Sequence, residues 1–390
     1  MMTVIIFLIV LSFLVIAHEW GHFIVAVKSG MKVYEFGLGF PPRVLGAYKD
    51  PKTKKWVFVW GKGKSSLKDA VDGEPSIEEY PTTLYSLNLL PLGGFVKIKG
   101  ENGESKNDKD SFGSHPYYKK AGVLVAGVVM NVVVAAMLLA IGFTIGLPTN
   151  VTNQQDLTDG ATIEKGPWVS IEQVKEGSTA KEGGLTFGDK ITKVDDLILK
   201  NSNEFIAYIS QTTSTNVSLV VEREGEALSK EIEVRGKPGE TGRIGAAIID
   251  VAHVSYPWYT SILKGITASI SILGAIYYSF FVLIKGMIMG SGGAMEVSGP
   301  VGIASIVGKS ARLGIQYLIN VTAMISLSLA AINILPIPAL DGGRLVFVTF
   351  EKIFKKPVPL KYEQLAHTLG FLLLMALIVW VTFKDITSLI

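Results

Sequence analysis

The chain of 390 residues contains no cysteine, which excludes a disulfide framework, thiolate chemistry and a cysteine-ligated metal. Its formal net charge is only +3, which gives no indication of a nucleic-acid partner. Apolar residues make up 48% of the chain and cluster in long runs, so the composition predicts an integral membrane protein rather than a single soluble domain.

Four apolar runs are each long enough to cross a hydrocarbon layer of about 30 Å as a helix. They predict a polytopic α-helical membrane protein with about four transmembrane helices. The predicted spans are residues 1–27, 121–147, 315–343 and 366–383, the third with a broken end. A fifth apolar stretch, 262–284, needs a topology argument.

The charge of the loops predicts the topology. Residues 28–120 contain sixteen Lys/Arg against eleven Asp/Glu, whereas residues 148–261 contain eleven against seventeen. Because cytoplasmic loops carry an excess of basic residues, the first loop is predicted to be cytoplasmic and the second to lie outside. The N-terminus is then extracytoplasmic and, with four spans, so is the C-terminus.

The same rule decides the fifth apolar stretch. If 262–284 spanned the membrane, the basic segment 344–365, expected to be a cytoplasmic loop, would face the outside. Asp341 would also end on the opposite side of the membrane from His18. We therefore interpret 256–312 as a membrane-associated helical segment on the outer side.

Two regions outside the spans have the patterns of strands. In residues 28–120, the stretches 33–48 and 84–101 are typical of strands and turns, and 49–81 of an exposed hairpin plus a loop. Residues 160–250 contain short alternating runs bounded by Gly and Asp, which predict a small α+β module. Asn201 or Ser202 is its expected helix cap.

The first span contains the sequence HEWGH, residues 18–22. His18 and His22 are four residues apart, so both imidazoles project from one face of a helix, and Glu19 lies on an adjacent part of that face. This pattern holds Zn²⁺ through two imidazoles and places a carboxylate beside a water. A chance match or a helix cap is the alternative, but ionisable groups within a membrane cost about 2.5 kcal/mol or more each and need partners. A divalent metal is such a partner.

A zinc hydrolase needs a third protein ligand and one open position. The remaining histidines, His115, His253 and His367, are expected in a polar linker, outside the membrane and at the membrane interface. Asp341 is the better candidate, since it ends an otherwise apolar span on the same side as His18. A helix-terminal Asp before two glycines is the alternative, but it does not account for the matching depth.

Polar and helix-breaking residues accompany this aspartate. Pro336 and Pro338 remove amide donors and interrupt the helix, and exposed backbone at membrane depth requires protein or a water-filled cavity around it. A wet pocket beside the metal site is therefore expected. Asn131 and Asn333 are further polar groups within spans, and an interhelical hydrogen bond is an equal alternative for each.

Five motifs together resemble the bacterial site-2 proteases, intramembrane zinc metalloproteases of the regulator-of-sigma-E type. They occur in the order found in that family and cover nearly the whole chain. The motifs are HEWGH (18–22), EFGLGFPPR (35–43), PLGGFVKIKGE (91–101), SGPVGI (298–303) and NILPIPALDGG (333–343). Residues 176–196 are similar to the PDZ domains of membrane proteases, so the inserted module is expected to be a single PDZ-like domain.

The resemblance implies a role for each site residue. His18, His22 and Asp341 would be the zinc ligands, and Glu19 the catalytic base. The loop PLGGFVKIKGE would dip into the membrane and receive substrate as an added strand through Gly93, Gly94, Phe95 and Val96. Asn131 and Asn333 match positions that help to hold the substrate backbone. Val128 departs from the family, which often has proline there, and the length of 49–81 has no explanation.

The resemblance also implies a cellular role. The protein would lie in the bacterial inner membrane, with its active site toward the cytoplasmic side and the PDZ-like module outside. Substrates would be single-span proteins already trimmed outside, such as anti-sigma factors, or remnant signal peptides, cleaved in regulated intramembrane proteolysis. The PDZ-like module would exclude bulky ectodomains, and it is a candidate site for a peptide or a substrate ectodomain.

Two other classes of function fit the sequence less well. A missing glutamate or metal ligand would favour a non-catalytic scaffold that binds partners through the PDZ-like module, but all four groups are present. A metal transporter would need further intramembrane carboxylates or histidines along a path, and the sequence has a single cluster. The sequence therefore favours the protease.

Overall fold

The structure is a computed structural model, and it divides into two compact units. Unit 1 comprises Met1–Leu138, Thr267–Ala311 and Val321–Ile390, and unit 2 comprises Leu139–Ile266 and Arg312–Asn320. The structure describes residues 2–61, 80–103, 108–152, 157, 160–175, 177–223, 225–237, 239–240, 243–289, 299–356 and 358–389. Part of the predicted 49–81 hairpin and loop, residues 62–79, and Ser298 of the SGPVGI motif lie outside the described residues.

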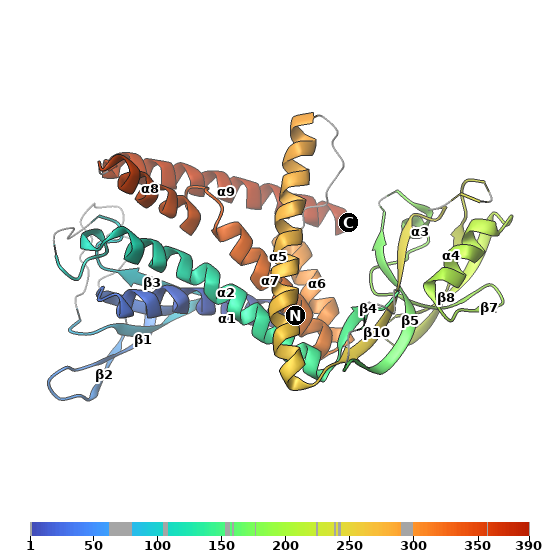
Figure 1. Cartoon of the computed structure of the whole chain (residues 1–390), viewed down its shortest axis with the longest axis horizontal. Coiled ribbons are helices and arrows are strands. Elements are labelled where there is room, and N and C mark those ends of the chain that lie inside the picture. Colours follow the sequence, from blue (N-terminus) through green and yellow to red (C-terminus); the bar gives the residue numbers. More distant parts are fainter. Residues whose placement is uncertain are drawn as a thin grey trace. The chain divides into compact units, whose positions relative to one another are not determined.

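Long apolar helices dominate the chain (Figure 1). Seven of the helices contribute to unit 1: α1 (Met2–Lys28), α2 (Tyr117–Ile145), α5 (Trp258–Met289), α6 (Pro300–Leu313), α7 (Ile315–Asn333), α8 (Asp341–Phe354) and α9 (Leu360–Leu389). Among the described residues, α1, α2, α5, α7 and α9 are long and apolar enough to cross a membrane. The sequence predicts about four spans. The difference is α5, which has the length of a span but which the charge argument assigns to the outer surface.

Two segments near the third predicted span differ from expectation. The span predicted over 315–343 is divided, because α7 ends at Asn333 and α8 begins at Asp341. The prediction of a loop over 344–365 is wrong for most of this segment, because α8 extends to Phe354 and α9 begins at Leu360. The apolar residues of α8 recur at helical spacing among charged and small residues, which makes this helix amphipathic. That periodicity was hidden by the overall basic composition of the segment.

A three-stranded antiparallel sheet completes unit 1. It consists of β1 (Val33–Lys49), β2 (Trp56–Trp60) and β3 (Leu84–Ile98), in the order β2-β1-β3. The first part of the sheet packs against α1 and α2 through a core that includes Phe23, Phe36, Ile98 and Val123. A short 3-10 helix, Phe112–Ser114, adds Phe112 to this core. This packing fixes β1 and β3 beside the HEWGH motif.

Glycines allow β3 to approach α1 closely. A Cβ atom on Gly93 would lie 2.9 Å from Val15 Cγ1, and Gly93 has φ +74°, a conformation that favours glycine. A Cβ atom on Gly94 would lie 2.8 Å from the carbonyl oxygen of Gly37 in β1. The pair of glycines therefore permits this part of β3 to lie against the middle of the first span.

Unit 2 is a small α+β module. Its sheet has the order β4-β10-β5-β6-β8-β9, with β7 paired to β6. The elements are β4 (Leu147–Asn150), β5 (Thr162–Val174), α3 (Thr179–Glu182), β6 (Lys190–Val194), β7 (Leu197–Ile198), α4 (Ser202–Gln211), β8 (Asn216–Arg223), β9 (Glu226–Glu233) and β10 (Ala246–Ser255). Alternating residues of these strands and Phe205 of α4 form one buried core. Asn201 caps α4 by accepting a hydrogen bond from the Glu204 amide.

Candidate metal centre

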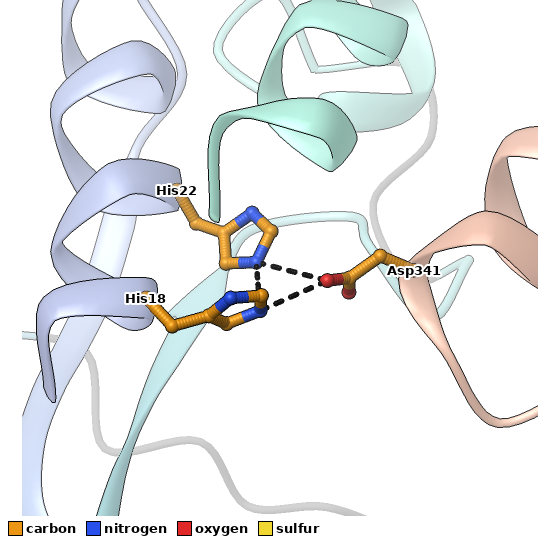
Figure 2. Close-up of side chains that lie close together, drawn as sticks. All are labelled: His18, His22 and Asp341. Carbon is orange, nitrogen blue, oxygen red and sulfur yellow. Dashed lines mark hydrogen bonds and ion pairs between the residues drawn. The ribbon is translucent and has the colours of Figure 1, made fainter. Parts of the chain in front are cut away.

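Three potential metal ligands meet inside unit 1 (Figure 2). His18 and His22 lie one turn apart on α1, and Asp341 is the first residue of α8. Asp341 Oδ2 is 2.9 Å from His18 Nε2 and 3.4 Å from His22 Nε2, and the two Nε2 atoms are 3.1 Å apart. Both histidines are buried, with 7% and 6% of their surface exposed. Residues more than 300 positions apart thus converge on one point.

Glycines bring α2 close to this cluster. A Cβ atom on Gly21 of α1 would lie 2.4 Å from the carbonyl oxygen of Ala126 in α2. A Cβ atom on Gly127 would lie 2.4 Å from His22 Nε2 and 2.7 Å from His18 Nε2. Only a residue without a side chain fits at either position, so the two helices approach closely and α2 forms one wall of the site.

The hydrogen bond at the other nitrogen of His22 fixes its tautomer. Nδ1 of His22 lies 2.7 Å from the carbonyl oxygen of Val123. Because a carbonyl only accepts, Nδ1 must carry the hydrogen, and the neutral ring then has its lone pair on Nε2. That lone pair points at Asp341 and His18. The arrangement is the one required of a metal-binding imidazole.

Asn131 contacts the corresponding nitrogen of His18. The Asn131 amide lies 3.3 Å from His18 Nδ1, while its Oδ1 is buried without a hydrogen-bond partner among the described residues. Exchanging the amide oxygen and nitrogen, which are assigned from hydrogen bonding, places Oδ1 where it accepts from His18 Nδ1–H. His18 then has its lone pair on Nε2, as His22 does. The hydroxyl of Ser326 in α7 donates a hydrogen bond to the backbone carbonyl of Asn131 and so links this turn of α2 to α7.

The donor set fits zinc. Zn²⁺ is held by imidazole nitrogens and carboxylate oxygens at about 2.0–2.2 Å, so the ligand atoms of a tetrahedral site are about 3.3 Å apart. The three separations here, 2.9, 3.1 and 3.4 Å, are close to that value. Two neutral imidazoles and one carboxylate also leave a fourth position open, as catalytic zinc sites require.

A pocket opens beside the three ligands. Glu19 and Asn333 line it, as do His18, Asn131 and Asp341, and apolar residues complete the wall: Val15, Leu329, Ala339 and Leu340. A Cβ atom on Gly94 would be 4.0 Å from Glu19 Cγ, so β3 passes beside the carboxylate. The structure therefore brings Glu19 and both asparagines to the same pocket as the ligands.

The remaining predicted substrate-binding residues lie on β3, outside the lining of this pocket. Gly93 and Gly94 are buried against α1 and β1, as described above. Phe95 is half-buried and stacks on Phe40 of β1, with ring centroids 6.3 Å apart. Val96 packs against the core beneath the sheet. In the sheet, Gly94, Phe95 and Val96 pair with Leu38, Gly37 and Phe36 of β1, and among the described residues no strand pairs with the other side of this part of β3.

The loop before Asp341 is held by the last helix. Ala339 has φ +78°, which is unusual for a residue with a side chain, and its amide donates a 2.8 Å hydrogen bond to His367 Nδ1 of α9. A Cβ atom on Gly370 would lie 2.5 Å from the carbonyl oxygen of Pro338, so α9 contacts the loop directly. Gly342 and Gly343 fit equally closely against the backbone of Ile334–Pro338.

Three residues of the site were missed in the sequence. Gly127 lies four residues before Asn131, on the same helical face, and this spacing is a signal that could have identified it. Val123 acts through its backbone carbonyl, so its side chain carries no signal. His367 was expected at the membrane interface, and its contact with Ala339 depends on tertiary packing that no local pattern indicates.

The site and fold are those of a membrane metallopeptidase, with a histidine pair inside the apolar helix α1 and a carboxylate at the start of α8. The sequence matches the model of peptidase family M50 over residues 6–60 and 76–377. The chain therefore belongs to peptidase family M50, the site-2 proteases, and it is a multi-pass membrane protein and a zinc-dependent intramembrane protease.

Individual proteins of similar sequence are also named as zinc metalloproteases. A Clostridium perfringens protein named "Putative zinc metalloprotease" is 30% identical over 386 residues, 99% of this chain and 98% of that protein. The zinc metalloprotease RasP of Shouchella clausii is 26% identical over 480 residues, with all of both chains covered. The solved PDZ domain of the SdrC-like protein of Listeria innocua is 32% identical, covers 21% of this chain and 92% of its own, and has a TM-score of 0.19.

Proposed function

We propose that the protein cleaves the transmembrane segments of single-span proteins, with His18, His22 and Asp341 as zinc ligands and Glu19 as general base. The convergence of these ligands beside a pocket lined by Glu19 is the observation that carries the proposal. In an apolar helix, uncompensated histidines would be costly, and a metal offsets that cost.

Bound Zn²⁺ would supply Lewis-acid chemistry, polarising the scissile carbonyl and acidifying a water. Glu19 accepts a proton from the attacking water on a carboxylate oxygen and later delivers it to the nitrogen of the leaving amine. Asn131 holds the His18 ring in the tautomer that leaves Nε2 available. The Val123 carbonyl has the same task at His22.

Substrate recognition has to overcome helical hydrogen bonding. A transmembrane helix hides its carbonyls, so a cleavable segment must unwind and its freed backbone groups must find partners. Pairing with the outer side of β3 at Gly93–Val96 supplies part of these hydrogen bonds. The side chain of Asn333, and the atom of the Asn131 side-chain amide that does not contact His18, supply further hydrogen bonds at the pocket. The edge position of β3 supports this role.

We further propose that the substrates are already trimmed outside the membrane, such as anti-sigma factors or remnant signal peptides. The charge distribution of the loops supports an extracytoplasmic unit 2, a PDZ-like module, and an active site toward the cytoplasmic side of an inner membrane. A module in that position would exclude a bulky ectodomain.

The experiment compares two versions of one single-span substrate, one carrying a folded ectodomain and one ending a few residues outside the span. Purified protein is reconstituted in liposomes, and products are mapped by mass spectrometry. Cleavage inside the span, restricted to the trimmed substrate, is expected. Cleavage in the ectodomain, or equal cleavage of both versions, would rule the proposal out.

A further inference from the structure

The hairpin of β1 and β2 has no part in the proposed catalytic function, and it combines exposed aromatic side chains with exposed lysines. In Figure 1 it extends away from α1. Trp56, Phe58 and Trp60 alternate along β2 and are 52%, 61% and 76% exposed. Residues at alternate positions of a strand share one face, so these rings form a row on one side of the hairpin.

The row continues across the sheet. Residues directly opposite each other in antiparallel strands also share a face. Trp60 is opposite Leu45, Phe58 is opposite Ala47, and Leu45 and Ala47 are in turn opposite Leu87 and Tyr85 of β3. The ring centroids of Trp56 and Tyr85 are 6.0 Å apart. We call these residues the aromatic face: Leu45, Ala47, Trp56, Phe58, Trp60, Tyr85 and Leu87.

Four lysines surround the turn of the hairpin. Lys49, Lys52, Lys54 and Lys55, the tip lysines, are all exposed. The acidic residue beside them, Asp50, accepts hydrogen bonds from the Lys52 amide and the Thr53 hydroxyl, so it serves the turn itself. Among the described residues, no ion pair neutralises a tip lysine. The hairpin therefore joins an apolar face to a concentrated positive charge.

Contacts with α1 give the depth of each part of the hairpin. The middle of β3 lies beside the middle of α1, where the Gly93 amide is 3.4 Å from Ser12 Oγ. The beginning of β3 lies nearer the C-terminal end of α1, since the rings of Tyr85 and Phe23 are 6.0 Å apart. Val15 and Phe23 are separated by about 12 Å along the helix axis. Leu45 is opposite Leu87 and Ala47 is opposite Tyr85, so β1 runs toward the C-terminal end of α1 as it approaches the hairpin turn. The tip lysines therefore lie beyond Phe23, toward the end of α1 at Lys28.

We propose that the aromatic face lies in lipid and that the tip lysines bind the headgroups of anionic phospholipids at the membrane surface. Tryptophan and tyrosine favour the boundary between hydrocarbon and headgroups, and lysines just beyond this boundary attract anionic lipids. The order along the hairpin, apolar beside the middle of the span and basic beside its end, matches that boundary. Charge complementarity selects the anionic lipid as the occupant.

The test uses the two tryptophans of the hairpin as reporters. Trp20, Trp168, Trp258 and Trp380 are replaced by Phe, which leaves Trp56 and Trp60, and Glu19→Gln prevents turnover. The protein is reconstituted in vesicles of phosphatidylcholine and phosphatidylglycerol in equal amounts. Bromine, which quenches tryptophan fluorescence on contact, is placed on the acyl chains of either lipid.

Quenching by both lipids is expected, and brominated phosphatidylglycerol should quench at least about twofold more strongly than brominated phosphatidylcholine. Lys→Gln at all four tip lysines should abolish this preference. The matched control carries Lys→Gln at four exposed lysines of unit 2, Lys165, Lys175, Lys200 and Lys237, and should retain it. Raising the salt concentration from about 0.05 M to about 0.5 M should weaken the preference for phosphatidylglycerol. This measurement keeps all four tip lysines, so it does not depend on the folding of the Lys→Gln variant.

Three results would overturn the proposal. Absence of quenching by either lipid would show that the face is not in lipid. Equal quenching by both lipids would show that the lysines do not select anionic headgroups. Loss of quenching on addition of a single-span substrate would identify the substrate, rather than lipid, as the occupant. None of these results depends on zinc binding or cleavage, so they are separate from the test of the proposed protease function.

Discussion

Nδ1 of His22 lies 2.7 Å from the backbone carbonyl oxygen of Val123 on the neighbouring helix α2. A backbone carbonyl is present whatever side chain the sequence encodes, so the tautomer of His22 is insensitive to substitution at position 123. His18 differs, because its Nδ1 faces the side chain of Asn131. The two histidines are therefore held by α2 in different ways, and only one of the two supports can be removed by mutation.

Replacing Asn131 tests this support. Asn131→Leu removes the acceptor for His18 Nδ1–H, and zinc affinity should fall by about 10- to 100-fold, the usual effect of losing such a partner. Asn131→Asp keeps an acceptor and should retain most of the affinity. Zinc affinity is measured by competition with a chelator. Unchanged affinity in Asn131→Leu, with a raised KM for substrate, would instead assign Asn131 to substrate binding alone.

Gly127 should tolerate no side chain. In Gly127→Ala, the new Cβ would overlap both imidazoles, so zinc binding and activity should be lost, and overpacking should destabilise the fold by about 1–3 kcal/mol. Gly122→Ala on the same helix is the matched control, since its Cβ would meet only Val25 Cγ1 at 3.8 Å. The measurement is the zinc content of both purified variants. Equal zinc content would contradict the helix packing described here.

His367 is a positioning residue for the loop that carries Asp341. His367→Leu removes the acceptor for the Ala339 amide, and we expect a roughly tenfold loss of zinc affinity with little change in KM. His367→Asn retains an acceptor of similar reach and should restore most of the affinity. Zinc affinity that is retained in His367→Asn but lost in His367→Leu would show that the hydrogen bond to the Ala339 amide is responsible. Equal loss in both variants would point to ring packing against Phe347, 5.5 Å away.

The stability of unit 2 should depend on the protonation of His253. The ring of His253 contacts those of Trp168 and Tyr317, and burial lowers the pKa of His253 below the ordinary value, with a further contribution from the charge of Lys165. Because the unfolded chain then binds the proton more readily, stability is fully present above about pH 6.5 and is lost as the pH falls through the folded pKa.

Urea unfolding of the whole chain in detergent, followed by proteolysis within unit 2, measures this dependence between pH 7.5 and 5. The urea midpoint should fall with pH in the wild type and fall less in His253→Phe. Lys165→Gln should reduce the slope in the same direction, because it removes one cause of the lowered pKa. Identical slopes in the wild type and His253→Phe would show that other groups determine the pH dependence.

The three residues that meet in the candidate site could be selected from the sequence because each of them violates a local rule. Histidines and a glutamate in an apolar helix are costly, and an aspartate at the end of a proline-broken span needs a partner at the same depth. Helical spacing then places His18 and His22 on one face. The structure adds the distances that bring Asp341 within reach of both.

The surroundings of the ligands were not predictable in the same way. The contact between His367 and Ala339 joins two segments whose packing no periodicity reports, and Val123 acts only through its backbone. The helix α8 was missed because Lys355, Lys356 and Lys361, which follow it, make the segment 344–365 basic as a whole. The prediction of an exposed hairpin plus a loop over 49–81 did not include the row of exposed aromatic side chains on β2.

The most direct test of the account counts zinc and measures cleavage in the wild type, Glu19→Gln and His22→Ala, using a trimmed single-span substrate in liposomes. We predict about one zinc per chain in the wild type and in Glu19→Gln, cleavage only in the wild type, and neither zinc nor cleavage in His22→Ala. Cleavage by Glu19→Gln, or a full complement of zinc in His22→Ala, would contradict the assignment of these residues.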